Sequence, residues 1–136
     1  MADVKRNPLV LVVCAVIFRG SKFLAARRSA AQSNALLWEF PGGKVDQDEI
    51  ETNALVRELQ EELGIVVAAG KRLTPVLYKY PSFTIELIPY LCTIVSGTPH
   101  SHEHAEIRWI FPEEAQELEW APADIPVLQE IVRDLN

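Results

Sequence analysis

Apolar residues occur along most of the chain in short runs that have the length of β-strands. Residues 9–18 are rich in Val, Leu and Ile, and a second apolar run covers 23–26 after Arg19, Gly20 and Ser21. Two such runs separated by turn residues predict a hairpin. Further strands are expected at 37–40, 65–67, 72–80, 83–94 and 107–111.

The apolar pattern changes to a helical period in the middle of the chain. Leu55, Leu59 and Leu63 recur at every fourth position, and the residues between them are mostly charged. Gly64 follows the last of these leucines and is a usual helix stop. An amphipathic helix is therefore expected over about 50–64.

Strands thus dominate the middle of the chain, with one long helix inserted early. A short helix is expected from Pro112 and a terminal one over 125–135, and a turn is expected at Pro41-Gly42-Gly43. This order predicts an α/β fold in which a mixed central sheet packs between helices. The length of 136 residues fits one domain, taken as 1–136.

Charge and hydropathy narrow the classes of partner. The net charge is -6, and no segment reads as a basic stripe, so polynucleotides are not expected as partners. An acidic protein still binds a polyphosphate when bound cations reverse the local sign of the site. The apolar run at 9–18 is too short to span a bilayer, so we expect no membrane partner and a cytoplasmic location.

The two cysteines do not suggest redox or zinc chemistry. Cys14 and Cys92 lie far apart in apolar runs, without the close pairing that such motifs need. We expect buried free thiols rather than a disulfide.

Three glutamates crowd one side of the predicted helix. Glu58, Glu61 and Glu62 are three and four positions apart and lie away from the leucine stripe. Like charges at these spacings each destabilise an isolated helix by roughly 0.2 to 0.5 kcal/mol, so a compensating partner is expected, either Arg57 or metal ions. Hard oxygen ligands suit Mg²⁺ or Mn²⁺. The alternative is an acidic face that is simply solvated.

The order of residues around this helix decides against the alternative. Gly43 is followed after five residues by Glu49, and after seven more by the segment RELQEELGI at 57–65. This pattern matches the Nudix box at every fixed position. The segments at 37–44 and 121–126 resemble the MutT and CTP pyrophosphohydrolase branch of that family, so the resemblance covers nearly the whole chain.

The resemblance implies the Nudix α/β/α sandwich and a small-molecule nucleotide substrate. It also implies hydrolysis of a nucleoside triphosphate to the monophosphate and pyrophosphate. By the same resemblance, metal ions are bound by the carboxylates of the box and by one backbone carbonyl, namely by Glu58, Glu61, Glu62 and Gly42.

The remaining catalytic roles also follow from the resemblance. Glu58 and Glu61 count as catalytic residues together with Glu49, which assists from the start of the helix. Arg57 is expected to orient the carboxylates through charge-assisted hydrogen bonds, a role that suits its planar guanidinium.

The segment HSHEH at 100–104 supplies a further catalytic residue. The spacing from Glu103 to Trp109 resembles the MutT-type loop whose glutamate reaches the metal centre, so Glu103 is expected as a metal ligand or general base. Alternate histidines could also indicate zinc. No cysteine or fourth ligand is near them in the sequence, so we expect solvated loop histidines, of which His102 and His104 tune Glu103 or touch phosphate.

Four residues are expected to contact the nucleotide. Arg28 matches an arginine that contacts nucleotide in MutT-type enzymes, although a solvated strand-edge arginine is the alternative. Tyr80 and Phe83 offer a stacking surface, although aromatic residues at strand spacing also occur in cores. Asp124 takes the place of an asparagine that MutT carries, and an ionised aspartate favours the amine of cytosine. An aspartate protonated by burial would still read oxidised guanine, and Asp124 could instead cap the last helix.

The substrate class leaves two rivals. The box fixes the metal chemistry but not the substrate. The substrate could be CTP, dCTP or 8-oxo-dGTP, and the alternative is a nucleoside diphosphate sugar or ADP-ribose. A catalytically silent Nudix domain that senses a ligand is the second rival, but this chain keeps all the box carboxylates. The sequence is compatible with a monomer or a homodimer.

Overall fold

The computed structural model describes residues 7–135, so residues 1–6 and Asn136 of the expected domain lie outside the described residues. The strands are β1 (Leu9–Arg19), β2 (Lys22–Arg27), β3 (Trp38–Glu39), β4 (Gly42–Lys44), β5 (Val66–Arg72), β6 (Val76–Lys79), β7 (Thr84–Ser96) and β8 (Glu106–Ile110). The helices are α1 (Glu51–Leu63), the 3₁₀ helices η1 (Pro112–Glu117) and η2 (Pro122–Asp124), α2 (Ile125–Glu130) and the π-helical turn η3 (Ile131–Leu135).

The strands form one mixed sheet around β1. β1 and β7 run parallel over nine residue pairs, from Leu9 opposite Thr84 to Ile17 opposite Cys92. All other pairings are antiparallel, and the main strand order is β3-β2-β1-β7-β5. β4 pairs with β1, β6 with β7 and β8 with β2.

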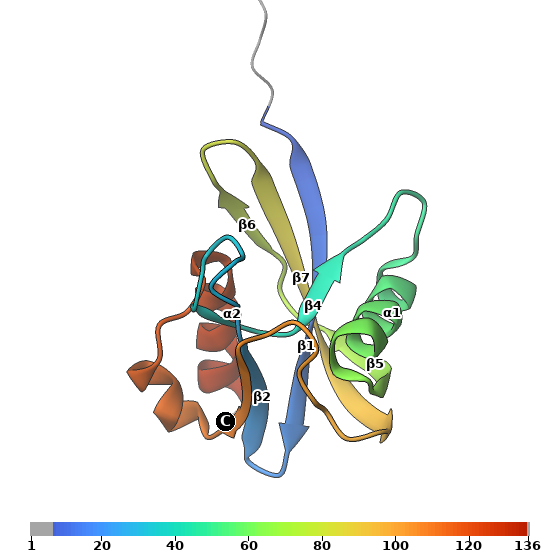
Figure 1. The fold of residues 1–136 in the computed structure, drawn as a ribbon, viewed down its shortest axis with the longest axis vertical. Coiled ribbons are helices and arrows are strands. Elements are labelled where there is room, and N and C mark those ends of the chain that lie inside the picture. The colour runs from blue at the N-terminus through green and yellow to red at the C-terminus, as the bar shows by residue number, and fades with distance from the viewer. Residues whose placement is uncertain (1–6, 136) are drawn as a thin grey trace, which may run out of the picture.

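Helices cover both faces of this sheet. Figure 1 shows α1 on one side and α2 on the other, with the strands between them. Because both faces are covered, β1 carries a nearly continuous apolar run rather than alternating polar and apolar residues. The structure confirms the expected α/β/α sandwich with a mixed central sheet.

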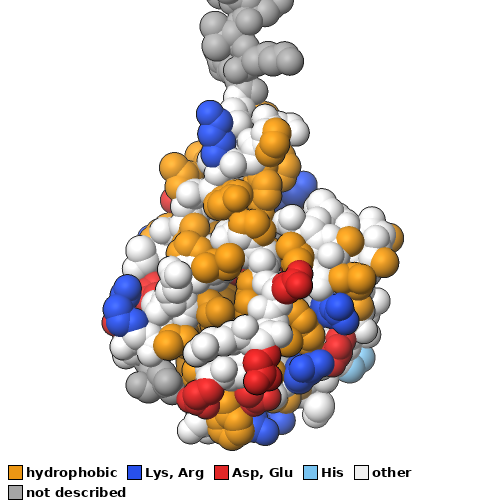
Figure 2. All heavy atoms as spheres, turned by 90° about the vertical axis from the view of Figure 1, so that its left-hand side faces the viewer, with side chains coloured by type: hydrophobic (Ala, Val, Ile, Leu, Met, Phe, Trp, Pro, Cys, Tyr) orange, Lys and Arg blue, Asp and Glu red, His pale blue; other side chains and the backbone are white. Residues whose placement is uncertain are grey.

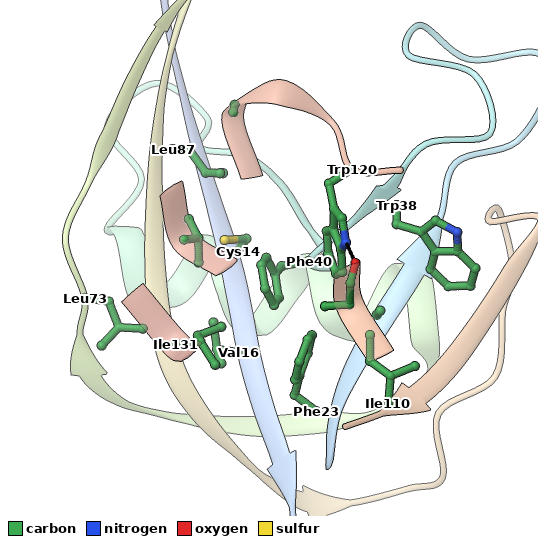
Figure 3. Close-up of a cluster of buried hydrophobic side chains, with 14 residues drawn as sticks. Cys14, Val16, Phe23, Trp38, Phe40, Leu73, Leu87, Ile110, Trp120 and Ile131 are labelled. Atoms are coloured by element: carbon green, nitrogen blue, oxygen red, sulfur yellow. Dashed lines mark hydrogen bonds between the residues drawn. The ribbon is translucent and has the colours of Figure 1, made fainter. Parts of the chain in front are cut away.

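Alternate residues of β1 feed two hydrophobic clusters. Val13, Ala15 and Ile17 pack on the α1 side with the apolar stripe of the helix, which includes Leu55 and Leu59. The opposite cluster, drawn in Figure 3, contains Cys14, Val16, Phe23, Trp38, Phe40, Leu73, Leu87, Ile110, Trp120 and Ile131. The indole Nε1 of Trp120 donates to the carbonyl of Ala115. This hydrogen bond gives a partner to a polar N–H that would otherwise be buried without one.

Two expected strands differ in extent from the observed ones. The single strand expected at 72–80 is broken, because Pro75 has no N–H and the amide of Thr74 donates to Glu130 instead. The strand expected at 37–40 shortens to β3, because the Phe40 amide donates to Asp124 and Pro41 cannot continue the ladder.

The turn expected at Pro41-Gly42-Gly43 was also wrong. Gly42 and Gly43 belong to β4, where they pair with Cys14 and Val13 of β1. A Cβ on Gly42 would strike the carbonyl of Val13, so the close approach of the two backbones needs glycine there.

The remaining expectations on cysteines and surface can be checked directly. Both cysteines are buried free thiols, as expected. On the face shown in Figure 2, Lys and Arg side chains are scattered among acidic and hydrophobic ones. Within residues 7–135, no helix has the length and hydropathy needed to cross a membrane.

Candidate active site

One pocket of about 740 Å³ collects most of the residues that the sequence marked as functional. Its lining includes the expected metal-binding residues Gly42, Glu58 and Glu62. All four expected nucleotide contacts, Arg28, Tyr80, Phe83 and Asp124, line the same pocket. The volume falls within the range of about 300 to 1,000 Å³ that is usual for small-molecule sites.

Helix α1 presents its glutamates unequally to this pocket. Glu58 and Glu62 line it, with side chains that are 15% and 16% exposed. The Glu61 side chain is 60% exposed and lines a shallow surface depression instead. Its Oε2 lies 3.4 Å from Nη1 of Arg57. The structure therefore brings two of the three box carboxylates together in the pocket and leaves the third outside it.

Arg57 connects the carboxylates at the start and middle of the helix. Its Nε and Nη2 donate to the two oxygens of Glu49 at 2.9 and 2.8 Å, and its Nη1 donates to Glu58 at 2.9 Å. Nη2 also donates to the carbonyl of Lys44 in β4. The hydrogen bonds from Arg57 and from the Asp46 amide lower the pKa of Glu49 to about 2. Arg57 therefore fixes these carboxylates relative to β4.

Glu62 is a confined acidic group with one carboxyl oxygen that lacks a hydrogen-bond partner among the described residues. This atom, Oε2, is buried. Burial, followed by the charges of Glu39, Glu58 and Glu103, raises the pKa of Glu62 to about 8. Burial also raises the pKa of Glu58 despite its contact with Arg57.

These features fit a hard divalent cation. A Cβ on Gly43 would fill the space that the Glu58 carboxylate occupies, so this glycine keeps the backbone of β4 next to the acidic groups. A cation would supply the partner that Glu62 lacks and would relieve the repulsion among the carboxylates. Within residues 7–135, no three His, Cys, Asp or Glu side chains form a closed ligand cluster. Backbone carbonyls, such as that of Gly42, and water would therefore complete the coordination.

Glu39 is a pocket residue to which the sequence reasoning gave no role. Its Oε1 accepts from Nη1 of Arg28 at 2.8 Å, and its Oε2 lies 3.0 Å from Nε2 of His104. Its position between the buried Trp38 and Phe40 was the available signal, because alternation along a strand turns Glu39 to the opposite face.

His104 corrects the expectation of solvated loop histidines. Its side chain is only 3% exposed, and its Nδ1 is buried without a hydrogen-bond partner among the described residues. Its Nε2 lies 4.0 Å from Glu62. His104 therefore lies between Glu39 and Glu62.

Glu103 and Arg28 take positions that qualify their expected roles. Glu103 is exposed on the loop between β7 and β8, near enough for its charge to raise the pKa of Glu62. Arg28 lines the pocket, but its Nε donates to the carbonyl of Ser33 while Nη1 holds Glu39. The alternative of a solvated edge arginine does not describe it.

Tyr80 and Phe83 form an aromatic wall of the pocket. Their rings are stacked with centroids 5.1 Å apart, and the Tyr80 hydroxyl accepts from the side-chain amide of Asn34. Both side chains are partly exposed, so they are available to a flat ligand rather than enclosed in the core.

Asp124 is a buried acid rather than a helix cap. Its Oδ2 accepts from the Phe40 amide at 2.9 Å, and its side chain makes no capping hydrogen bond to α2. Burial, with a further contribution from the charge of Glu39, raises its pKa well above the ordinary value. This direction favours the neutral acid, which the sequence left open as the alternative to an ionised aspartate.

The raised pKa of Glu62 predicts a pH-dependent stability of the metal-free protein. The Glu62 carboxyl has a pKa of about 8 in the folded state and an ordinary value of 4.5 in the unfolded state. The folded state therefore binds the proton more tightly, and stability should fall as pH rises from about 5 to 8. The loss attributable to Glu62 is on the order of a few kcal/mol. Urea unfolding in EDTA across this pH range measures it, and the difference between wild type and Glu62→Gln isolates the contribution of this one group. An identical pH slope in the two proteins would contradict the prediction.

Comparison with known proteins agrees with this geometry. Residues 8–131 match the NUDIX domain. The chain is 43% identical over 121 residues to a CTP pyrophosphohydrolase of Escherichia coli (strain K12), covering 89% of this chain and 90% of that protein. It is 35% identical over 129 residues to the putative 8-oxo-dGTP diphosphatase 2 of Mycobacterium tuberculosis (strain ATCC 25618 / H37Rv), covering 93% and 90%.

A solved structure gives the same result for the fold. The crystal structure of the MutT protein from Methanosarcina mazei Go1 matches with a TM-score of 0.83 and 29% identity, covering 96% of this chain and 97% of that chain. The family match extends over most of the chain, and the acidic helix α1 lies within the matched residues. The chain therefore belongs to the Nudix family and is a Nudix hydrolase.

Proposed function

We propose that this chain hydrolyses a nucleoside triphosphate to the monophosphate and pyrophosphate with Mg²⁺ or Mn²⁺, acting on the cytoplasmic nucleotide pool. The observation that carries the proposal is one pocket that joins the carboxylates of α1 to an aromatic and hydrogen-bonding subsite of nucleotide size. Nudix hydrolases generally use divalent metal ions. Relatives named CTP pyrophosphohydrolase and 8-oxo-dGTP diphosphatase support a triphosphate substrate.

Each acidic residue has a defined part in this proposal. Glu58, Glu62 and the Gly42 carbonyl hold the metal, and Glu61 joins them by turning its exposed side chain from outside the pocket. When bound, the metal neutralises phosphate charge and lowers the pKa of a water molecule. Arg57 and Glu49 keep Glu58 in place, and the exposed Glu103 accepts the proton of the attacking water.

The base subsite fits cytosine also when Asp124 is neutral, and the relative named CTP pyrophosphohydrolase makes cytidine nucleotides the first candidate. A neutral Asp124 has one O–H donor and one free acceptor position beside the bond from Phe40. Cytosine presents a ring nitrogen acceptor next to its amine donor, so one acid group satisfies both. The same pair of functions also fits 8-oxo-dGTP, and the raised pKa of Asp124 keeps that nucleotide as the second candidate.

A product-release assay tests the proposed reaction. The panel contains CTP, dCTP, the other ribo- and deoxynucleoside triphosphates, 8-oxo-dGTP, ADP-ribose and nucleoside diphosphate sugars, each with Mg²⁺, Mn²⁺ or EDTA. We expect monophosphate and pyrophosphate from triphosphates, highest kcat/KM for cytidine nucleotides, and no turnover in EDTA. Preferential cleavage of ADP-ribose or a nucleotide sugar would replace the proposal, and no turnover of any compound would favour a ligand sensor.

Asp124→Asn tests the role of this residue in base selection. Asparagine keeps an acceptor for the Phe40 amide but always presents an NH₂ donor, whereas the aspartate can also ionise and accept from the amine of cytosine. We expect the ratio of kcat/KM for dCTP over 8-oxo-dGTP to fall by about tenfold, which is the cost of roughly one mismatched hydrogen bond. An unchanged ratio would show that Asp124 does not read the base. Glu119→Gln is the control, because it changes an exposed acidic side chain close to Asp124 in the sequence.

A further inference from the structure

Two exposed histidines outside the pocket face one another on the loop between β7 and β8. The Nε2 atoms of His100 and His102 lie 2.8 Å apart. The two rings approach obliquely, with centroids 4.5 Å apart and planes at 57°. Neither side chain is among those that line the nucleotide pocket.

The other nitrogen of each ring contacts a backbone carbonyl. Nδ1 of His100 lies 3.2 Å from the oxygen of Thr98, and Nδ1 of His102 lies 3.0 Å from the oxygen of Glu61. A carbonyl oxygen only accepts, so each Nδ1 carries a proton. In neutral rings, both Nε2 atoms are then lone-pair acceptors that face each other at hydrogen-bonding distance. Such a pair repels unless a positive species lies between the two nitrogens.

We propose that His100 and His102 bind a tetragonal transition-metal ion, Cu²⁺ or Ni²⁺, through their Nε2 atoms, with water in the remaining positions. Histidines that ligate metals usually donate their second ring N–H to a carbonyl or carboxylate, and both rings do so here. This site is separate from the carboxylate site of α1 and offers imidazole, a ligand that suits these ions better than Mg²⁺.

The distance between the nitrogens selects the coordination geometry. With metal–nitrogen bonds of about 2.05 Å, the 2.8 Å separation gives a nitrogen–metal–nitrogen angle of about 86°. Neighbouring positions of a square-planar or octahedral ion are close to this angle, whereas tetrahedral zinc needs about 109° and a wider pair. The geometry therefore favours Cu²⁺ and Ni²⁺ over Zn²⁺.

The backbone around the pair holds it at the carboxyl end of α1. The amides of His100 and His102 donate to the carbonyls of Leu63 and Glu62 in the last turn of the helix. The partial negative charge of a helix carboxyl end favours a cation there. The same loop carries Glu103. A bound ion would therefore restrict the movement of Glu103 relative to α1.

Calorimetric titration with NiCl₂ tests the site, using protein without a histidine tag and excess Mg²⁺ to saturate the carboxylates. We expect the wild type to bind one Ni²⁺ per chain. In His100→Ala and in His102→Ala the affinity for Ni²⁺ should fall by about tenfold or more, because each change removes one of two protein ligands. Ser101→Ala lies between the two and should bind as wild type does. Electron paramagnetic resonance with Cu²⁺ should show two coupled nitrogens, falling to one in each histidine variant.

Three outcomes would overturn the proposal. If the wild type takes up no Ni²⁺ at a Ni²⁺ concentration about 100 times that of the protein, the pair does not bind the ion and shares a proton instead. A site with useful affinity is filled at that excess of ion. Equal binding in wild type and both alanine variants would place the ion elsewhere. Tighter binding of Zn²⁺ than of Ni²⁺ or Cu²⁺ in the same titration would contradict the geometry. Circular dichroism of each variant checks that the fold is retained.

Discussion

Glu62→Gln is expected to lower kcat by about a thousandfold or more while the protein remains folded. Glu62 lies in the pocket with an oxygen that has no protein partner, and it is surrounded by the charges of Glu39, Glu58 and Glu103. A glutamine amide is a poor ligand for a hard divalent ion, so metal binding at this position should be lost. Steady-state assays over a range of Mg²⁺ concentrations measure the effect.

The same substitution should not destabilise the metal-free protein at neutral pH. Burial raises the pKa of Glu62 to about 8, so at neutral pH glutamine replaces a largely neutral group of similar shape. Glu51→Gln is the matched control, because Glu51 lies on the same helix but contacts Arg72 and Tyr90, outside the pocket. The control should keep wild-type kcat. If Glu62→Gln kept more than a tenth of wild-type activity in saturating Mg²⁺, Glu62 would not be a metal ligand.

The helix that carries these groups could be predicted closely because its signals are local. Leu55, Leu59 and Leu63 are fully buried, as their spacing indicated. Gly64 ends the helix with a φ of 68°, a left-handed conformation that glycine adopts at low cost. Only the orientation of Glu61 departed from expectation, because a pattern of spacings does not fix the side-chain torsions of an exposed residue.

The nucleotide side of the pocket could be predicted only in part because its contacts are distant in sequence. The hydrogen bond from Phe40 to Asp124 joins residues 84 positions apart, and the contact from His104 to Glu39 spans 65. No periodicity encodes such pairs. Asp124 was identified as a site residue by resemblance, but its neutral state depends on burial and on the charge of Glu39, which only the folded structure reveals.

Burial also explains why His104 departs from the expectation of solvated loop histidines, which His100 and His102 meet. The segment at 100–104 alternates in composition, and one imidazole turns inward while two remain exposed. His104 enters the pocket beside Glu39, whereas His100 and His102 cap α1 with their amides and face one another. Three identical side chains thus take two different environments according to the backbone contacts of the loop.

Arg57→Lys is expected to lower kcat/KM by about 10- to 100-fold, the usual scale for losing a group that orients metal ligands. The guanidinium donates to both oxygens of Glu49 and also to Glu58. A lysine has a single nitrogen and cannot bridge these two carboxylates in the same geometry. Glu58 should then be held less firmly, so the concentration of Mg²⁺ for half-maximal activity should rise together with the loss of kcat.

Arg72→Lys provides the matched control for this last change. Arg72 makes a similar contact through Nε and Nη2 to the two oxygens of Glu51, at the start of the same helix but outside the pocket. A general loss of helix stability would affect both variants, and thermal unfolding would detect it. A role in orienting metal ligands would lower the activity of Arg57→Lys alone. If the two variants kept the same kcat/KM and the same Mg²⁺ requirement as wild type, Arg57 would serve only to neutralise charge on the helix.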